Sequence, residues 1–226
     1  MDKNYNKIIK KLKSLANPKN VEGMARFGIS SQKTLGVSIP VLRKMAKQIG
    51  KNHKLALELW DSGIHEARIL AGFIDETTRV TEKQMEKWVG DFDSWDVCDQ
   101  VCSSLFDKTE FIWRKIEALT KRKEEFIKRT GFTLMACLAV HDKKAQDKDF
   151  IKLLPIIKRE TTDERNFVKK AVNWALRQIG KRNKNLNKQA IKLAQEILKI
   201  DNKTARWIAN DALRELKSEI VQNRLA

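Results

Sequence analysis

The chain has 226 residues, of which 46 are Lys or Arg and 29 are Asp or Glu, so its formal net charge is +17. With 9 Gly and 3 Pro in a sequence that is 42% hydrophobic, collagen-like, low-complexity and wholly disordered proteins are excluded. No apolar run approaches the roughly 18–20 residues that span a membrane, and the N-terminal stretch lacks a signal-peptide core, so we expect a cytoplasmic protein. Such a positive charge is typical of proteins with a polyanionic partner, and nucleic acid is the first candidate.

Almost every segment has the apolar period of an amphipathic helix, and alternating β-branched runs are missing. In chain order, the predicted helices span residues 3–15, 38–49, 54–61, 65–74, 81–89, 94–106, 111–120, 124–141, 147–160, 163–179, 186–200 and 204–221. The sequence from Thr81 to Gln84 is typical of a capping box at a helix start. Because the connections are short and no Pro/Gly/Ser-rich linker divides the chain, we predict one domain over residues 1–226.

Four segments share a pattern in which a basic residue precedes alternating small and large apolar residues on one helical face. They are HEARILAGFI (65–74), FIKRTGFTLM (126–135), FVKKAVNWAL (167–176) and TARWIANDAL (204–213). The last two intervals are close to the ~40-residue period of HEAT-type helix pairs. This pattern favours an all-α fold, a right-handed α-solenoid of HEAT-like helix pairs with a basic concave groove, and a generic helical bundle stays open as the alternative.

A basic stretch between Phe167 and Lys192 carries no acidic residue and has Trp174 near its centre. Its charged side chains are Lys169, Lys170, Arg177, Lys181, Arg182, Lys184, Lys188 and Lys192. Contact with nucleic acid requires basic side chains that bind phosphates and a nearby aromatic ring that packs on a sugar or base. The stretch therefore predicts a DNA-binding face, although a solvated helix face with Trp174 in the core fits the same pattern.

Four carboxylates lie between Asp91 and Asp99, although the chain has the opposite net charge. Asp93 or Ser94 can cap a helix there, and Asp96 in the first turn suits the positive end of the helix dipole. Asp99 lies one turn further in, four residues after Trp95, so its carboxylate shares a helix face with the indole. A carboxylate beside the binding surface of a polyanion weakens binding, so we interpret Asp99 as a group that stabilises a cation. An ordinary surface aspartate with Trp95 packed inward remains possible.

Cysteine and histidine give little sign of chemistry in this sequence. Cys98, Cys102 and Cys137 are expected to be buried thiols. Cys98/Cys102 and Cys137/His141 are i,i+4 pairs that could hold zinc, but there is no CxxC knuckle, and we predict no metal site. Gly-rich phosphate loops are absent, so no cofactor is indicated, and His65 at a helix start is expected on the surface.

Five stretches together resemble the alkylpurine DNA glycosylases of the AlkD type. They are GMARFGI (23–29), LGVSIPVLRKMAK (35–47), LELWDSGIHEAR (57–68), DSWDVCDQV (93–101) and NFVKKAVNWALRQIGK (166–181), and the resemblance extends from about Met24 to Leu216. That family is a HEAT-like helical solenoid that excises cationic N3- and N7-alkylated purines without metal or cofactor. It keeps the lesion in the duplex, and no base-specific pocket is evident in this sequence.

The resemblance implies a set of site residues. The family's Trp-x-x-x-Asp pair corresponds to Trp95 and Asp99, its second active-site tryptophan to Trp174 (followed by Arg177), and a DNA-facing arginine to Arg129. At Phe27 family members carry Tyr, so this chain keeps the ring and loses the hydroxyl, and Ser94 replaces a Trp. Trp95, Asp99 and Trp174 are thus the expected catalytic residues, with Arg129, Arg177, Phe27 and Lys170 contacting DNA.

The chemistry of the lesion agrees with this resemblance. A 3- or 7-alkylpurine is already cationic, so the base leaves without a general acid and only the oxocarbenium-like sugar needs stabilisation. We therefore expect a monofunctional glycosylase that hydrolyses the N-glycosidic bond of such purines in duplex DNA. We further expect a monomer without cofactor, metal, membrane or obligate protein partner, associated with the nucleoid through DNA. A catalytically inactive duplex-binding protein and a protein-interaction scaffold remain the alternatives.

Overall fold

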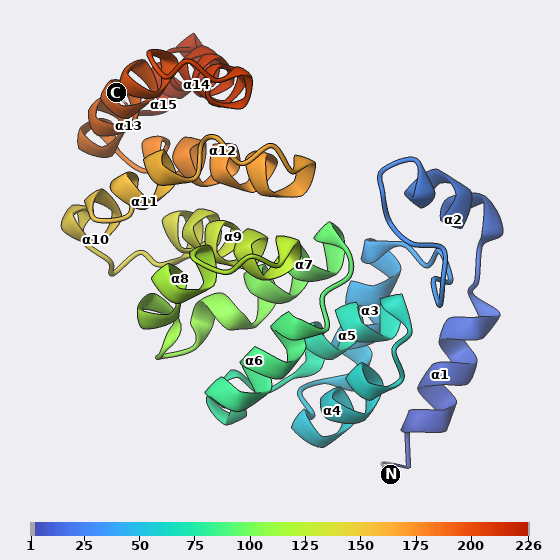
Figure 1. Ribbon diagram of the computed structural model, residues 1–226. Coiled ribbons are helices and arrows are strands. Elements are labelled where there is room, and N and C mark those ends of the chain that lie inside the picture. Colours follow the sequence, from blue (N-terminus) through green and yellow to red (C-terminus); the bar gives the residue numbers. More distant parts are fainter. Residues whose placement is uncertain (1–2, 226) are drawn as a thin grey trace. The chain divides into compact units, whose positions relative to one another are not determined.

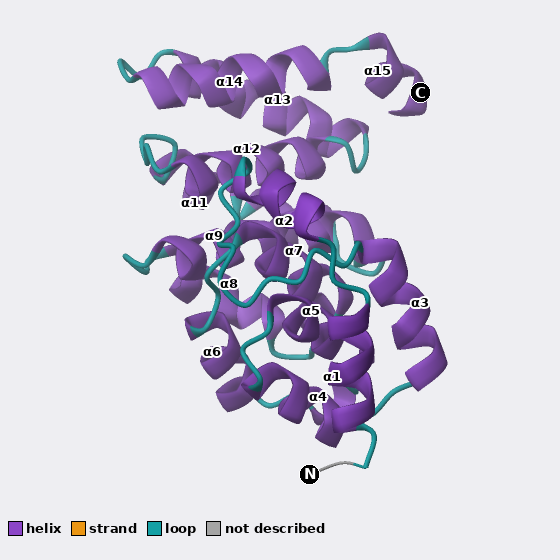
Figure 2. Cartoon of the chain, turned by 90° about the vertical axis from the view of Figure 1, so that its right-hand side faces the viewer, coloured by secondary structure: helices purple, strands orange, loops and turns teal. Residues whose placement is uncertain are grey.

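The computed structural model describes residues 3–225, and every regular element within this range is a helix (Figure 1). Figure 2 shows these helices joined by loops, without a strand in the described part of the chain. The all-α prediction is therefore confirmed. The chain divides into two compact units, residues 1–111 (unit 1) and residues 112–226 (unit 2). One domain over residues 1–226 stays a prediction, because two compact units can belong to one domain.

Unit 1 is organised around one central helix that contacts four others. Its helices are α1 (Tyr5–Ser14), α2 (Pro18–Ala25), α3 (Ile39–Ile49), α4 (His53–Asp61), α5 (His65–Ile74), η1 (Thr77–Arg79), α6 (Glu82–Gly90), α7 (Trp95–Ser104) and η2 (Phe106–Lys108). The central helix, α5, packs against α1, α3, α4 and α7. Trp60 and Trp88 stack in the core with ring centroids 4.0 Å apart and planes 2° from parallel. The Trp60 indole donates to Asp91 Oδ2 at 2.8 Å, so the buried ring keeps its hydrogen bond.

Unit 2 consists of helices that pack against their neighbours along the chain. Its helices are α8 (Ile112–Thr120), α9 (Glu125–His141), α10 (Asp147–Ile151), α11 (Leu154–Arg159), α12 (Asn166–Gly180), α13 (Lys184–Leu198), α14 (Lys203–Leu216) and α15 (Glu219–Leu225). α9 packs against α8 and α12, and α14 packs against α12 and α13. The four repeat segments predicted from the sequence lie in α5, α9, α12 and α14. Each therefore occupies the second helix of a local pair, as a helical repeat requires.

A glycine inside α9 permits a close approach between two helices of unit 2. A Cβ at Gly131 would lie 2.6 Å from Thr120 Cγ2, 3.0 Å from the Thr120 nitrogen and 3.2 Å from the Ile116 carbonyl oxygen. Two of these atoms belong to the α8 backbone, which cannot rotate away. The cost of glycine within a helix is thus balanced by tight packing of α8 on α9.

Three helix predictions need correction. Residues 147–160 form two helices instead of one, because Pro155 lacks an N–H and restricts the backbone before it. The segment 204–221 likewise divides into α14 and the start of α15. The sequence analysis missed α2, whose first residue is Pro18 and whose N-cap, Asn17, accepts from the Asn20 backbone N–H. Within residues 3–225, no helix is long and apolar enough to cross a membrane.

Candidate nucleic-acid interface

Trp95 and Asp99 occupy the first turns of α7 in unit 1, on one face of the helix as their spacing predicts. Both side chains are half-buried. The Trp95 indole donates its N–H to the Phe27 carbonyl oxygen at 3.1 Å, so two predicted site residues are brought together. Ser94 stands at the N-cap, but its buried hydroxyl makes no hydrogen bond and does not cap the helix. Asp93 does not replace it, because this exposed carboxylate pairs with Arg68 at 3.4 Å.

A His–Asp pair joins the first residues of α5 and α7. His65, expected on the surface, is only 6% exposed, and its Nε2 lies 2.8 Å from Asp96 Oδ2. Burial alone lowers the pKa of His65, but the hydrogen bond to Asp96 and the charges of Asp96, Glu66 and Asp93 raise it above its ordinary value. The other carboxylate oxygen, Asp96 Oδ1, is buried without a hydrogen-bond partner. Such an orphaned acceptor costs about 1–3 kcal/mol.

The loop before α3 is held against the start of α5 by a buried carboxylate. Glu66 is fully buried and accepts backbone N–H groups from Leu35, Gly36 and Val37 at 2.6–3.3 Å. Gly36 has a φ of +77°, and a Cβ there would lie 2.3 Å from the Asn17 carbonyl oxygen. Glycine is therefore required both by the backbone conformation and by the close approach of α2.

A pocket of about 440 Å³ lies in unit 1 beside Phe27 and Trp95. It is lined by α2, by the loop that follows it, and by the first residues of α3, α5 and α7. Val37 and Ile69 contribute apolar surface, whereas His65 and Asp96 contribute polar atoms. The sequence offered no base-specific pocket, because the lining residues come from segments up to 81 positions apart.

In unit 2, α12 carries most of the remaining predicted residues. Trp174 is half-buried and Lys170 is exposed. Arg129, expected to face DNA, is 5% exposed, and its Nη1 donates to the Phe167 carbonyl oxygen at 2.6 Å. Arg129 therefore ties α9 to the first turn of α12, a structural contact that the sequence did not predict.

Arg177 does not stand in an acid-free environment. Its guanidinium pairs with Glu215 and its Nε lies 3.6 Å from Asp211 Oδ2, while Lys181 Nζ lies 2.5 Å from Glu215 Oε1. Burial raises the pKa of Glu215, but hydrogen bonds and charge from Lys181 and Arg177 hold that pKa below its ordinary value. The basic stretch is acid-free only in sequence, because α14 brings two carboxylates onto it.

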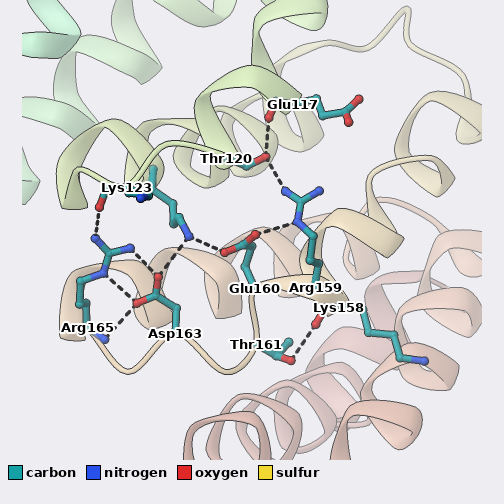
Figure 3. A network of polar contacts seen from close by, with 10 residues as sticks. Glu117, Thr120, Lys123, Lys158, Arg159, Glu160, Thr161, Asp163 and Arg165 are labelled. Carbon is teal, nitrogen blue, oxygen red and sulfur yellow. Dashed lines mark hydrogen bonds and ion pairs between the residues drawn. The ribbon is translucent and has the colours of Figure 1, made fainter.

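Ion pairs and one hydrogen bond hold the segment before α12 against α9 and against the connection between α8 and α9 (Figure 3). Arg165 pairs with Asp163 at 2.5 Å and donates to the Lys123 carbonyl oxygen at 2.5 Å. Lys128, largely buried, contacts Glu160 at 2.5 Å and Asp163 at 3.4 Å. Burial raises the pKa of Glu160, but the hydrogen bonds from Lys128 and Arg159 lower it overall. This network holds the helix from which Lys170 and Trp174 project.

One exposed aromatic side chain in unit 2 escaped the sequence analysis. Trp207 on α14 is 42% exposed, and Lys169 Nζ lies 5.5 Å from its ring centroid. Phe126 and Phe167, at the starts of α9 and α12, stack with centroids 5.6 Å apart. The signal that could have revealed Trp207 is its position in the fourth repeat segment, directly after Arg206.

The cysteines occupy the core, as predicted. Cys98 and Cys102 are fully buried and Cys137 is nearly so. Among the described residues, no group of three or more His, Cys, Asp and Glu side chains is arranged to hold a metal ion.

Comparisons with known proteins identify the family. One solved structure, described as "a new family of proteins related to the HEAT-like repeat DNA glycosylases with affinity for branched DNA structures", superposes with a TM-score of 0.82. It covers 100% of this chain and 96% of the other at 19% identity, and this shows a shared HEAT-like helical-repeat fold, the predicted α-solenoid class.

Another solved structure is an engineered protein, which has a TM-score of 0.38 and 14% identity over 88% of this chain and 97% of that one. A third is a designed armadillo repeat protein in complex with a (KR)4 peptide, which has a TM-score of 0.35 and 13% identity over 81% of this chain and 88% of that one. Both similarities are too weak to support an argument.

No curated protein matches the chain. Residues 8–216, however, match the family described as "DNA alkylation repair enzyme". The chain therefore belongs to the DNA alkylation repair enzyme family.

Proposed function

We propose that this protein is a monofunctional DNA glycosylase that hydrolyses the N-glycosidic bond of cationic N3- and N7-alkylated purines in duplex DNA. The observation that carries the proposal is the Trp95–Asp99 pair on one face of α7 in a chain of this family. An indole and a carboxylate on the same face suit a cationic sugar, which needs attraction without proton donation to the base.

Asp99 is assigned the main electrostatic role. Loss of an alkylated purine leaves positive charge on the sugar, and an ionised carboxylate fixed beside it stabilises the transition state more than the ground state. The same carboxylate can orient the attacking water. Trp95, held by its bond to the Phe27 carbonyl, supplies a ring face whose attraction to a cation is worth roughly 0.5–2 kcal/mol.

The residues of unit 2 are assigned to DNA contact. Half-buried Trp174 supplies a second ring, and exposed Lys170 is available to a phosphate. Arg177 contacts a phosphate by exchanging its carboxylate partners for DNA. Arg129 contributes to DNA binding through its positive charge and because it fixes the start of α12. In unit 1, the Phe27 ring is 70% exposed and can contact a sugar or base without a hydroxyl. The protein is proposed to act as a monomer without a cofactor, in the cytoplasm.

A second candidate is a DNA-binding protein that does not excise bases. It is favoured by the related structure, whose description names affinity for branched DNA. A protein-interaction scaffold is a weaker candidate, because a net charge of +17 suits DNA better than a general protein partner.

The experiment that separates these functions measures base release. The protein is incubated with methylated duplex DNA, and free 3-methyladenine and 7-methylguanine are quantified against DNA without protein. Release above the spontaneous rate supports the glycosylase. Tight, salt-dependent binding of DNA without release contradicts it and supports the binding protein, and absence of DNA binding supports the scaffold.

A further inference from the structure

The last of the four repeat segments has a tryptophan where the other three have a basic residue. In chain order, the fourth position of these segments is Arg68, Arg129, Lys170 and Trp207. Trp207 on α14 is 42% exposed, whereas the next residue, Ile208, is fully buried. A single exposed apolar side chain indicates no function by itself, so the surroundings of Trp207 decide what it can bind.

The side chains around Trp207 are mainly cationic. Lys169 of α12 places its Nζ over the indole, 5.5 Å from the ring centroid, and so supplies the cation that this position lacks. Lys203 is exposed one turn before Trp207, on the same face of α14. Asp211, one turn after Trp207, already has Arg177 as a partner at 3.6 Å. The exposed indole therefore lies among charges that attract phosphates.

Trp207 also lies on the seam between α12 and α14 that holds Arg177. The two helices run in the same direction, since Asn173 donates to the Ile208 carbonyl oxygen at 3.3 Å and Arg177 pairs with Glu215 further along both helices. Glu215 follows Trp207 by eight residues, which is about 12 Å along α14. A DNA strand with a phosphate bound at Arg177 therefore passes within a few nucleotides of Trp207.

We propose that Trp207 and Lys169 bind a single-stranded DNA segment that flanks the bound duplex. An unpaired base stacks on the indole, and a phosphate beside it pairs with Lys169. The faces of bases within a duplex are covered by their neighbours, so an exposed indole meets a free base face only where the strand is unpaired. Aromatic rings beside cations are the combination with which proteins bind single strands without sequence preference. The inference goes beyond the proposed function, because it requires DNA binding but no excision, and it leaves the lesion in the duplex.

The experiment measures the affinity of the full chain for labelled DNA by fluorescence anisotropy. A blunt duplex is compared with the same duplex carrying a thymidine tail, placed at the 3′ end and at the 5′ end in turn. The wild type should bind one of the tailed duplexes about fivefold more tightly or better, because stacking of a base on an aromatic ring adds to phosphate contact. A tail of abasic sugar–phosphate units keeps the phosphates, and it should lose most of this gain.

Variants separate the ring from the charge. Trp207→Leu should remove the preference for the thymidine tail, whereas Trp207→Phe should keep most of it because a ring remains. Lys169→Gln should make the slope of log K against log salt for the tailed duplex shallower by about 0.7. Ile220→Ala is the control, since it truncates an apolar side chain of α15 that is 83% exposed. Thermal unfolding should show that each variant folds.

Three results would overturn the proposal: equal affinity for blunt and tailed duplexes, an equal gain from the abasic tail, or an unchanged tail preference in Trp207→Leu. The base-release assay keeps this test separate from the proposed function. A wild type that prefers the thymidine tail but excises nothing refutes the glycosylase and retains the single-strand site. A wild type that excises without any tail preference refutes the single-strand site alone.

Discussion

Neutralising Glu215 should strengthen DNA binding, because it releases Arg177 and Lys181 from an internal partner. All three side chains are between 19% and 29% exposed, so their pairing is partly screened by water. Exposed pairs are worth about 0.2–1 kcal/mol, and we take the upper limit of about 1 kcal/mol for two cations sharing one carboxylate. If Arg177 and Lys181 must both leave Glu215 to reach phosphates, Glu215→Gln should tighten duplex binding about fivefold.

The assay is fluorescence anisotropy with a labelled duplex at several salt concentrations. The slope of log K against log salt should become steeper by about one unit in Glu215→Gln and shallower by about one unit in Arg177→Ala. Glu196→Gln makes the same change in net charge at a carboxylate paired with Lys158 at 2.8 Å and serves as the control. The exchange of partners would be refuted if Glu215→Gln and Glu196→Gln raised the affinity for duplex DNA equally. It would also be refuted if Glu215→Gln raised the affinity as much in the Arg177→Ala variant as in the wild type.

Two predictions concern the stability of the separate units. The raised pKa of His65 favours the protonated imidazole in the folded state. The contribution of His65 to the free energy of unfolding is therefore fully present below about pH 6.5, and it is lost as pH rises through the pKa of His65 in the folded protein. Urea unfolding should therefore show His65→Asn losing more stability at about pH 5.5 than at about pH 8.5, and an equal loss at both would contradict the His65–Asp96 pair. Gly131→Ala places a Cβ against the α8 backbone and should lower the free energy of unfolding by about 1–3 kcal/mol, whereas an unchanged value would show that α8 can move away.

Local patterns were enough to predict most of the fold. The apolar period of α9, α12 and α13 is continuous along the chain, and their predicted ends differ from the observed ones by three residues or fewer. The failures have local causes too: Pro155 divides one predicted helix, and α2 has too few buried residues to produce an apolar stripe. Helix formation thus depended on information close in sequence.

The environment of the candidate site could not be predicted in this way. Spacing alone places Trp95 and Asp99 on one face of α7, but no pattern links His65 to Asp96, 31 residues away. Arg177 and Glu215 are 38 residues apart, so the neutralisation of the basic stretch depends on how α14 packs. The pocket beside Trp95 depends in turn on the buried Glu66 and on the positive φ of Gly36.

The most direct test of the central claim is single-turnover excision by Asp99→Asn, measured together with duplex affinity and thermal unfolding. Removal of the charge at constant shape should slow excision by roughly two orders of magnitude or more, about 3 kcal/mol of transition-state stabilisation. Duplex affinity should stay equal or rise slightly, because a charge that repels phosphates has gone, and the unfolding temperature should be unchanged. Near-normal excision, or a parallel loss of excision and stability, would contradict the assignment of Asp99 as the group that stabilises the cationic sugar.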